Sequence, residues 1–452
     1  MSYGIMGKYL SFNLSLIFIS FIFLILCSCN KKPELTGSSA ANSSEDWTSV
    51  GNTGSVSHTH SKSISHSTNL ISQQTSTSNN TSSKSSKTTF TSVISKLQTT
   101  SSSVNRAFLS PEVFNKGRDA YGGKSISIIG DSISHGANAP DIPEESYVAR
   151  LKKSLAAQYG VYNYGYTSLS YSIYNKLGVY NELHTVKVTD GIWNKGADSD
   201  WGSYPGYCAY KSQSESAAIS ITVDTKYKGF DRHINGFFLY YAAGPDKGTF
   251  TVEVGGKTLA SLNCYKSSED KCARSAFIAL PADAGDKVVI DIIKGTNKPI
   301  IITGIGYAEN PLAVTVNNYS LTGTQLVNVS DDVLKSVCKA NVVMLALGFN
   351  DAGYQADKET FKNKINVVIK SCKESGAKLI VLDTLWRFEI HKEFYRSELL
   401  RASNEADGKY ISFTTEYEDN PNMISDGAHP SVRGHYIIAR KICKELGIPL
   451  VM

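Results

Sequence analysis

The 452-residue sequence has no dense run of lysine or arginine, although its formal net charge at pH 7 is +5. A nucleic-acid-binding surface needs clustered basic residues interleaved with aromatic ones, so nucleic acid is not an expected partner. The sequence also contains neither a His-Glu-x-x-His stretch nor a paired Cys-x-x-Cys stretch. We therefore expect neither a metal ion nor a cofactor.

An apolar run long enough to span a bilayer comfortably is also missing, because the run from Leu14 to Leu26 falls short of the required length of about 20 residues. Its length matches the apolar part of a secretory signal peptide, and it closes on Leu26-Cys27-Ser28-Cys29. This ending resembles a bacterial lipobox, which implies that residues 1–28 are removed and that Cys29 is lipidated. An ordinary cleaved signal and an uncleaved anchor are the alternatives. Asn30 after the anchor favours the outer membrane of the cell envelope.

Residues 29–107 contain few apolar side chains and are dominated by Ser, Thr and Asn. Such a segment cannot bury enough surface to offset the entropy lost on ordering, so we expect a flexible tether. The most Ser- and Thr-rich part, residues 35–104, would span on the order of 50 Å as a random coil of about seventy residues. A lipid-anchored domain could then act well away from its membrane.

A buried strand followed by a sharp turn begins the globular part of the chain. In Lys124–Ser134, an alternating apolar run ends in Gly130-Asp131-Ser132. This pattern predicts a strand that places a serine at the carboxyl edge of a sheet, where ligands bind in open α/β folds. The hydroxyl of Ser132 is a candidate nucleophile if a base lies nearby. Alternatively, Asp131 and Ser132 only cap the next helix.

The pattern of strands and helices predicts two interleaved regions. Residues 108–213 and 310–452 alternate strand and helix, which predicts an α/β domain with a parallel sheet covered on both faces. Residues 214–309 instead consist of short β-like runs separated by turns such as Val254-Gly255-Gly256-Lys257. We therefore expect an all-β sandwich or jelly roll inserted into the α/β domain.

The cysteines divide between these two regions. Cys264 and Cys272 lie in one loop of the insert, where export would favour a disulfide between them. Two free thiols are the alternative. Cys338, Cys372 and Cys443 fall on apolar helix faces, and we expect them in the core.

Three further stretches supply candidate partners for Ser132. Asn350 directly follows an apolar strand, which places its amide at the same edge, where it can donate to a developing oxyanion. Asp426 and His429 lie three residues apart before the last helix, so the carboxylate can orient the imidazole toward a serine. His435 is the runner-up base. The structural alternatives are a simple turn at Asn350 and a helix cap at Asp426.

A glycine that follows a strand is a further candidate amide donor to an oxyanion. We favour Gly323 in Asn318–Thr324, while Gly165 after Val161–Tyr164 is the alternative. A glycine in either place is also explained by a backbone that requires positive φ.

The order of these four stretches resembles the four sequence blocks of the SGNH/GDSL hydrolases, a family of serine esterases with a flavodoxin-like three-layer α/β/α fold. The arrangement is most similar to bacterial peptidoglycan and other carbohydrate O-acetylesterases with an inserted β domain. The resemblance implies that Ser132 is the nucleophile, His429 the general base and Asp426 its orienting partner. It also implies an oxyanion hole formed by the Ser132 amide, the Gly323 amide and the Asn350 side chain. Ser320 departs from the pattern, because many members have a glycine there.

The resemblance implies a cell-envelope esterase that removes O-acetyl groups from a glycan such as peptidoglycan, held to the membrane by its lipid. The alternatives are a lipase-type or thioesterase-type acyl hydrolase of the same family and a non-catalytic glycan-binding lipoprotein. Aromatic side chains before the insert are candidates for stacking on sugar rings, or else they anchor the core and loops. They are Trp193, Trp201, Tyr204 and Tyr207.

Overall fold

The structure is a computed structural model, and the part of the chain that it describes begins at residue 108. The described ranges are 108–109, 111–114, 124–160, 162–169, 184–196, 209–224, 234–267, 272–386 and 391–452. The predicted signal peptide (1–28), the lipidation site Cys29 and the tether (29–107) therefore lie outside the described residues. Within the described ranges, no helix has both the length and the apolar character needed to cross a membrane.

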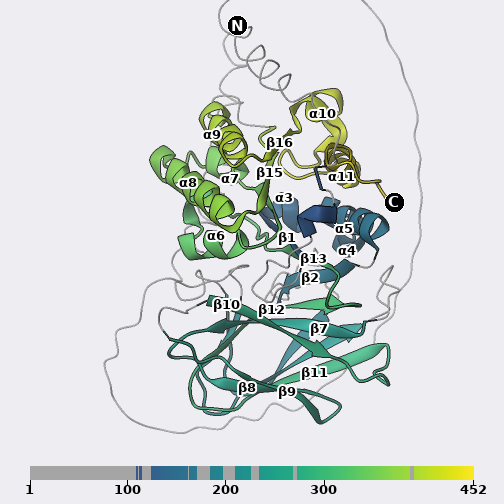
Figure 1. Ribbon diagram of the computed structural model, residues 1–452, viewed down its shortest axis with the longest axis vertical. Helices are drawn as coiled ribbons and strands as arrows, with labels where there is room; N and C mark the ends of the chain where they lie inside the picture. Colours follow the sequence, from purple (N-terminus) through teal and green to yellow (C-terminus); the bar gives the residue numbers. More distant parts are fainter. Residues whose placement is uncertain are drawn as a thin grey trace, which may run out of the picture. The chain divides into compact units, whose positions relative to one another are not determined.

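A parallel sheet forms the middle of the α/β region (Figure 1). Its strands in spatial order are β2 (Tyr162–Ser168), β13 (Val314–Asn318), β1 (Ser125–Gly130), β14 (Val342–Ala346), β15 (Lys378–Asp383) and β16 (Lys409–Ser412). Without β2, the order of the other strands by their place in the chain is second, first, third, fourth, fifth, as in flavodoxin-like sheets. The strand order reverses beside β1, so a crevice is expected at the carboxyl end of this strand.

Helices cover both faces of this sheet, which confirms the predicted three-layer α/β/α architecture. One face carries α5 (Tyr147–Tyr159) and α11 (Val432–Leu446), and the other carries α6 (Asp331–Val337), α8 (Lys358–Ser375) and α9 (Lys392–Glu405). Successive residues of β14 enter opposite cores, because Met344 packs with the first layer and Leu345 with the second. All residues of β14 are buried, as expected for a strand with helices on both sides.

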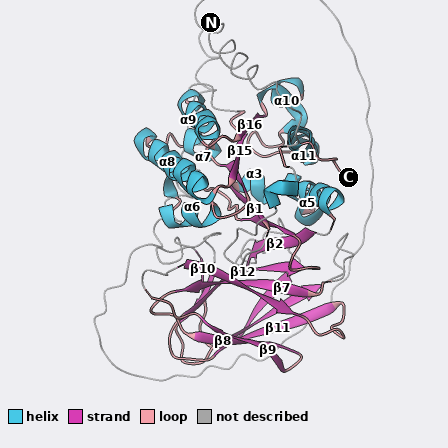
Figure 2. Ribbon diagram, viewed as in Figure 1, coloured by secondary structure: helices cyan, strands magenta, loops and turns pink. Residues whose placement is uncertain are grey.

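The inserted region is a sandwich of two antiparallel sheets, as predicted (Figure 2). One sheet contains β3 (His184–Asp190), β6 (Ala218–Asp224), β11 (Lys287–Lys294), β8 (Thr249–Val254) and β9 (Lys257–Asn263). The other contains β10 (Cys272–Ala279), β7 (Gly236–Ala243), β12 (Ile300–Ala308), β5 (Ala209–Ser212) and β4 (Asn194–Gly196). The predicted hairpin turn joins β8 to β9, with positive φ at both Gly255 (58°) and Gly256 (75°).

The sandwich and the α/β region share one continuous sheet. Strand β12 pairs antiparallel with β2, so the second sheet of the sandwich continues into the parallel sheet and the two make eleven strands among the described residues. Every residue of β12 is buried. Backbone hydrogen bonds, and not only side-chain packing, therefore fix the insert to the α/β region.

The sandwich begins earlier in the chain than we predicted. The sequence placed the start of the insert at residue 214, whereas β3 at His184–Asp190 already pairs with β6 of the sandwich. This strand lies at the edge of its sheet, and most of its residues are exposed or half-buried. Its apolar alternation is accordingly weak, which is why the pattern does not reveal it.

The cysteines also require one correction. Cys264 is a free thiol with 0% exposure in the core of the sandwich, so the predicted disulfide with Cys272 is wrong. The alternative of a free thiol holds for Cys264, while the side chain of Cys272 lies outside the described part. The helix cysteines Cys338, Cys372 and Cys443 are buried free thiols, as expected.

The aromatic residues proposed as sugar contacts are mostly not described. Trp193 is buried at 8% exposure, and its indole Nε1 donates to the Asp190 carbonyl at 3.2 Å. It therefore anchors the loop after β3, in line with the structural alternative. Trp201, Tyr204 and Tyr207 lie outside the described residues.

Candidate active site

Strand β1 places Ser132 at the carboxyl edge of the sheet, at the first position of the short helix α3 (Ser132–His135). Asp131 caps this helix, because its carboxylate accepts a hydrogen bond from the Ile133 amide at 2.9 Å. The turn requires glycine at position 130, since a Cβ atom there would collide with the Ser134 side chain and approach Ser320 Oγ to 2.9 Å. The local sequence thus forces the chain to turn just before the serine.

The structure brings Ser132, His429 and Asp426 into one hydrogen-bonded chain. His429 Nε2 lies 2.8 Å from Ser132 Oγ, and His429 Nδ1 lies 2.7 Å from Asp426 Oδ2. The carboxylate accepts a hydrogen bond from Nδ1–H, which leaves Nε2 as the acceptor that faces the serine hydroxyl. Two segments separated by almost the whole α/β region therefore bring a serine, a histidine and an aspartate together.

The carboxylate of Asp426 accepts hydrogen bonds from several donors. Its Oδ1 accepts the backbone amides of Ala428 at 3.0 Å and of His429 at 2.7 Å. Burial raises the pKa of Asp426, but the hydrogen bonds from His429, Ala428 and Asn138 outweigh burial and hold this pKa well below its usual range. The carboxylate is therefore ionised at neutral pH, as an orienting partner of the imidazole must be.

Asn138 is a supporting residue that the sequence analysis missed. Its side-chain Nδ2 donates to Asp426 Oδ2 at 3.1 Å and to Ser425 Oγ at 2.7 Å, which ties the segment after α3 to the loop of His429. Asn138 has a positive φ of 65°, a conformation that asparagine tolerates better than most residues. An Asn shortly after Gly130-Asp131-Ser132 is the available sequence signal, but its partner lies far away in the chain.

Asn350 lies beside the turn of Ser132, on the short helix α7 (Phe349–Gly353). Its Nδ2 donates to the Thr324 carbonyl at 3.1 Å and more weakly to Asp131 Oδ2 at 3.3 Å. These two acceptors aim the amide at the edge of the sheet. Nδ2 carries two hydrogens. One can keep its bond to the Thr324 carbonyl while the other leaves Asp131 and donates to an oxyanion at Ser132.

Gly323 and Gly165 lie in different parts of the fold, and Gly323 as the second amide donor stays a prediction. Gly323 is exposed with φ of 78°, and it lies in a loop tied to β1, since the Leu321 amide donates to the Gly130 carbonyl at 3.2 Å. Gly165 lies inside β2, where a Cβ atom would come within 2.5 Å of the Val316 carbonyl. Gly165 is therefore required for close packing of two strands and does not lie in the loop that follows β13.

Two buried carboxyl groups support these loops. Asp351 accepts the backbone amides of Leu326 at 2.8 Å and Val327 at 3.1 Å, and burial raises its pKa to about 6. Burial, with a smaller contribution from the charge of Asp351, raises the pKa of Asp131 to about 7. Both groups lie at the edge where an anionic intermediate would form.

His435, the runner-up base, has a structural role. It is completely buried, its Nδ1 accepts the Tyr147 amide at 3.3 Å, and its Nε2 faces the Ala137 carbonyl at 3.0 Å. Burial lowers its pKa to about 4. The imidazole therefore stays neutral with both nitrogens engaged, and it connects α11 to the segment that follows Ser132.

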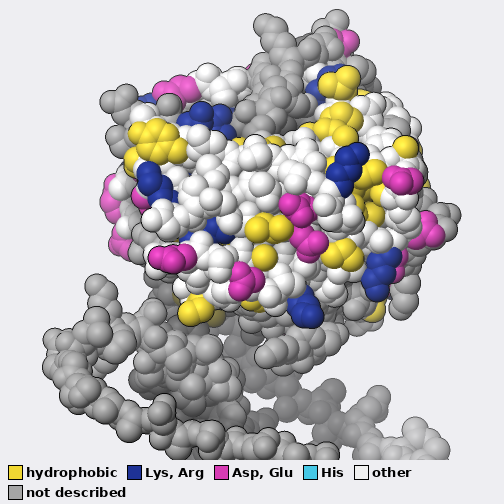
Figure 3. Space-filling view, turned by 90° about the horizontal axis from the view of Figure 1, so that it is seen from below, with side chains coloured by type: hydrophobic (Ala, Val, Ile, Leu, Met, Phe, Trp, Pro, Cys, Tyr) yellow, Lys and Arg dark blue, Asp and Glu magenta, His cyan; other side chains and the backbone are white. Residues whose placement is uncertain are grey.

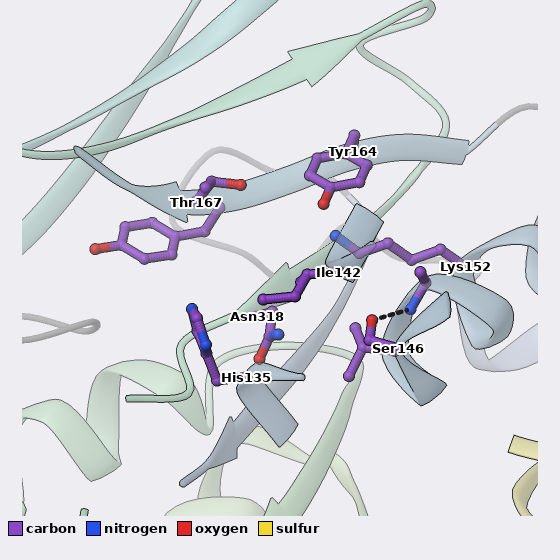
Figure 4. Close-up of a pocket in the computed structure, with 10 residues that line it drawn as sticks. His135, Ile142, Ser146, Lys152, Tyr164, Thr167 and Asn318 are labelled. Atoms are coloured by element: carbon purple, nitrogen blue, oxygen red, sulfur yellow. Dashed lines mark hydrogen bonds between the residues drawn. The ribbon is translucent and has the colours of Figure 1, made fainter. Parts of the chain in front are cut away.

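A small cavity, shown in Figure 4, is lined by residues of α3, α5 and β2. His135, Lys152, Tyr164 and Asn318 are among its lining residues, and its volume is about 40 Å³. Lys152 Nζ lies 3.6 Å from the centroid of the Tyr164 ring, so this ammonium group packs on an aromatic face. A cavity of this size has room for a few water molecules but not for a sugar ring.

Among the described residues, no group of three or more His, Cys, Asp or Glu side chains is arranged to hold a metal ion.

No family model matches the sequence, and no curated protein matches it either. Among solved structures, a peptidoglycan O-acetylesterase is similar over 74% of this chain and 93% of that chain, with 18% sequence identity and a TM-score of 0.52. A family two carbohydrate esterase from Clostridium thermocellum, in complex with cellohexaose, aligns with 53% of this chain and 94% of that chain at 12% identity, but with a TM-score of 0.25. The first similarity confirms the predicted fold at the level of the whole α/β region with its insert.

Proposed function

We propose that this protein is a serine ester hydrolase of the SGNH/GDSL type that removes acetyl groups from an O-acetylated carbohydrate. The observation that carries the proposal is the hydrogen-bonded chain from Asp426 through His429 to Ser132 at the carboxyl end of β1. An acceptor nitrogen 2.8 Å from a serine hydroxyl is the arrangement needed to remove its proton during attack. The fold shared with a peptidoglycan O-acetylesterase supports the same chemistry.

In the proposed mechanism, Ser132 Oγ attacks the acetyl carbonyl carbon while its proton passes to His429 Nε2. The Ser132 amide, the Gly323 amide and Asn350 Nδ2 donate to the oxyanion of the tetrahedral intermediate. His429 then gives its proton to the departing sugar oxygen, which leaves as a free hydroxyl group. Water, activated by the same imidazole, releases acetate and restores Ser132. Asp426 stabilises the imidazolium in both steps.

The exposure of the site supports a polymeric substrate. Ser132 itself is only 6% exposed, but the side chains of His429 and Asp426 beside it are 27% and 48% exposed, so the ester can approach from the side of these two residues. Peptidoglycan is the glycan favoured by the fold comparison, and an exported, lipid-anchored chain would reach it from the membrane. Export, the anchor at Cys29 and the outer membrane as its location remain predictions from the sequence.

The test is acetate release by the full-length chain from O-acetylated peptidoglycan and, separately, from acetylated xylan. Wild-type protein should release acetate, whereas Ser132→Ala should lower turnover by on the order of 10⁶-fold. Ser397→Ala, which changes an exposed serine on α9, is the matched control and should behave as wild type. The ratio between the two polymers identifies the glycan.

Other outcomes would support the alternative functions. Rates on p-nitrophenyl esters that rise with acyl chain length would indicate a lipase-type or thioesterase-type hydrolase. Glycan binding that persists in both wild type and Ser132→Ala, without turnover of polymer or p-nitrophenyl acetate, would identify a binding protein.

A further inference from the structure

Exposed aromatic side chains are rare in the described part of the molecule. Among its exposed large apolar residues, only Tyr354 and Tyr265 are aromatic, at 64% and 53% exposure. The face of the molecule in Figure 3 shows small groups of hydrophobic side chains among polar ones and charges of both signs. Tyr265 follows β9 in the sandwich, whereas Tyr354 follows the helix that carries Asn350.

Tyr354 lies one helical turn from Asn350. Tyr354 is the residue that caps the carboxyl end of α7, and its amide donates to the Asn350 carbonyl at 2.9 Å, so the two residues have helical i, i+4 spacing. Side chains at this spacing have Cβ atoms about 5–6 Å apart. Because Asn350 donates to Asp131 in the turn that carries Ser132, the backbone of the exposed Tyr354 lies one helical turn from the same site.

Hydrogen bonds hold the backbone on both sides of Tyr354. Gln325 Nε2 donates to the Asn350 carbonyl at 3.3 Å, which braces the loop of Gly323 against α7. After Tyr354 the chain turns through Gln355 with φ of 53°, and the Ala356 amide returns to the Asp351 carbonyl at 2.8 Å. An exposed ring on a fixed backbone loses little conformational entropy when it binds a ligand.

We propose that Tyr354 is a sugar-binding residue that stacks on a pyranose ring of the acetylated glycan, next to the sugar whose ester is cleaved. A pyranose has an apolar face of C–H groups bordered by hydroxyls, and tyrosine combines an apolar ring with a polar tip. The proposal rests on the proposed esterase function, and it names a residue that would make the enzyme prefer a polymeric substrate to a small ester. A small ester that carries no sugar would not reach this ring.

The test compares kcat/KM for acetate release from the O-acetylated polymer with kcat/KM for p-nitrophenyl acetate, using the full-length chain. Tyr354→Ala should lower the value for the polymer about tenfold more than the value for the small ester. Tyr354→Phe, which keeps the ring, should retain the preference for the polymer. Tyr265→Ala is the matched control and should leave both values unchanged. Equal losses on both substrates, or no loss on the polymer, would overturn the proposal.

A binding measurement separates this proposal from the proposed function. In a Ser132→Ala background, migration through a gel that contains the polymer reports affinity without turnover. Adding Tyr354→Ala should weaken retardation about tenfold, whereas adding Tyr265→Ala should not. If the wild type releases no acetate, the esterase proposal fails, and the gel still decides the role of Tyr354. Unchanged retardation, or none in any variant, would contradict sugar binding at this residue.

Discussion

The two regions of the molecule share one sheet but bury different side chains. All buried carboxyl groups among the described residues, namely Asp131, Asp351 and Asp383, lie in the α/β region, near the carboxyl ends of parallel strands. The core of the sandwich is built mainly from isoleucine, valine, phenylalanine and tyrosine. A carboxyl group is unfavourable to bury unless hydrogen bonds satisfy it, and each of these three accepts backbone or side-chain donors. Buried carboxyl groups, and not polar burial in general, therefore distinguish the α/β region from the sandwich, which buries His184, Lys247 and Lys294.

The largest expected effect is a loss of activity, and it should distinguish two histidines of the α/β region, His429 and His435. His429→Ala should lower kcat/KM on p-nitrophenyl acetate by on the order of 10⁶-fold, because no other base faces Ser132 in the described structure. His435→Leu should instead lower thermal stability, since the buried Tyr147 amide loses its acceptor, while the folded protein keeps its turnover. Steady-state kinetics and thermal unfolding measure the two effects. A His435 variant that is folded but inactive would contradict the assignment of the base.

The next largest effect concerns the side-chain amide of Asn350, which donates to the buried carboxyl group of Asp131. Asn350→Ala should lower kcat by about 10² to 10³-fold with little change in KM, because its donor acts on the transition state. Asp131→Asn should reduce kcat less, and it should add nothing in the Asn350→Ala background if Asp131 acts through Asn350. Asn366→Ala, an exposed amide on α8, serves as the control. Fully additive losses would show that the two residues act separately.

Core truncations compare the two regions directly. Ile290→Ala in β11 and Ile128→Ala in β1 both remove a side chain of at most 1% exposure. Each should lower the free energy of unfolding by about 2–5 kcal/mol, measured by urea denaturation. Turnover per folded molecule should fall only for Ile128→Ala, because β1 positions Ser132. Equal losses of turnover would mean that the shared sheet transmits strain from the sandwich to the site.

The smallest expected effect is a pH dependence that originates in the α/β region. Asp131 has a folded-state pKa of about 7 against an ordinary value of 3.8, so between these values the unfolded chain binds fewer protons than the folded one. Stability from this group is present at low pH and is lost as pH rises through about 7, by at most about 1.4 kcal/mol per pH unit. Melting temperatures between pH 4.5 and 8 should fall less steeply for Asp131→Asn than for wild type. Identical slopes would place the pKa of Asp131 nearer its ordinary value.

The fold and the close approach of four site residues could be predicted because each signal is local. Ser132 follows an apolar strand, Asn350 follows another, and Asp426 stands three residues before His429, so strand ends and helix spacing suffice to place them. The role of each in catalysis remains a proposal. The α/β alternation and the insert were visible for the same reason, since the period of apolar residues changes between them.

Other features depend on contacts between distant segments, and the sequence could not reveal them. Asn138 donates to Asp426, a contact between residues far apart in the chain. His435 and His429 both lie near the start of α11, and only the structure shows that His435 is completely buried. The different positions of Gly323 and Gly165 in the fold also depend on the strand order, which places β13 directly beside β1 and β2 beyond it. The edge strand β3 carries too few buried residues to show a period.

The strand order also sets a sequence of events during synthesis. Strand β1 has β13 and β14 as its neighbours, so Ser125 lies beside Thr315 and Ile126 beside Val342. Both neighbours are translated after the entire sandwich, and until then the strand that carries Ser132 has two unpaired edges. Such long-range parallel pairing is slow to form, and unpaired edges favour aggregation. A nascent chain that stops within the sandwich therefore cannot assemble the site, and completion of the insert must precede the appearance of any activity.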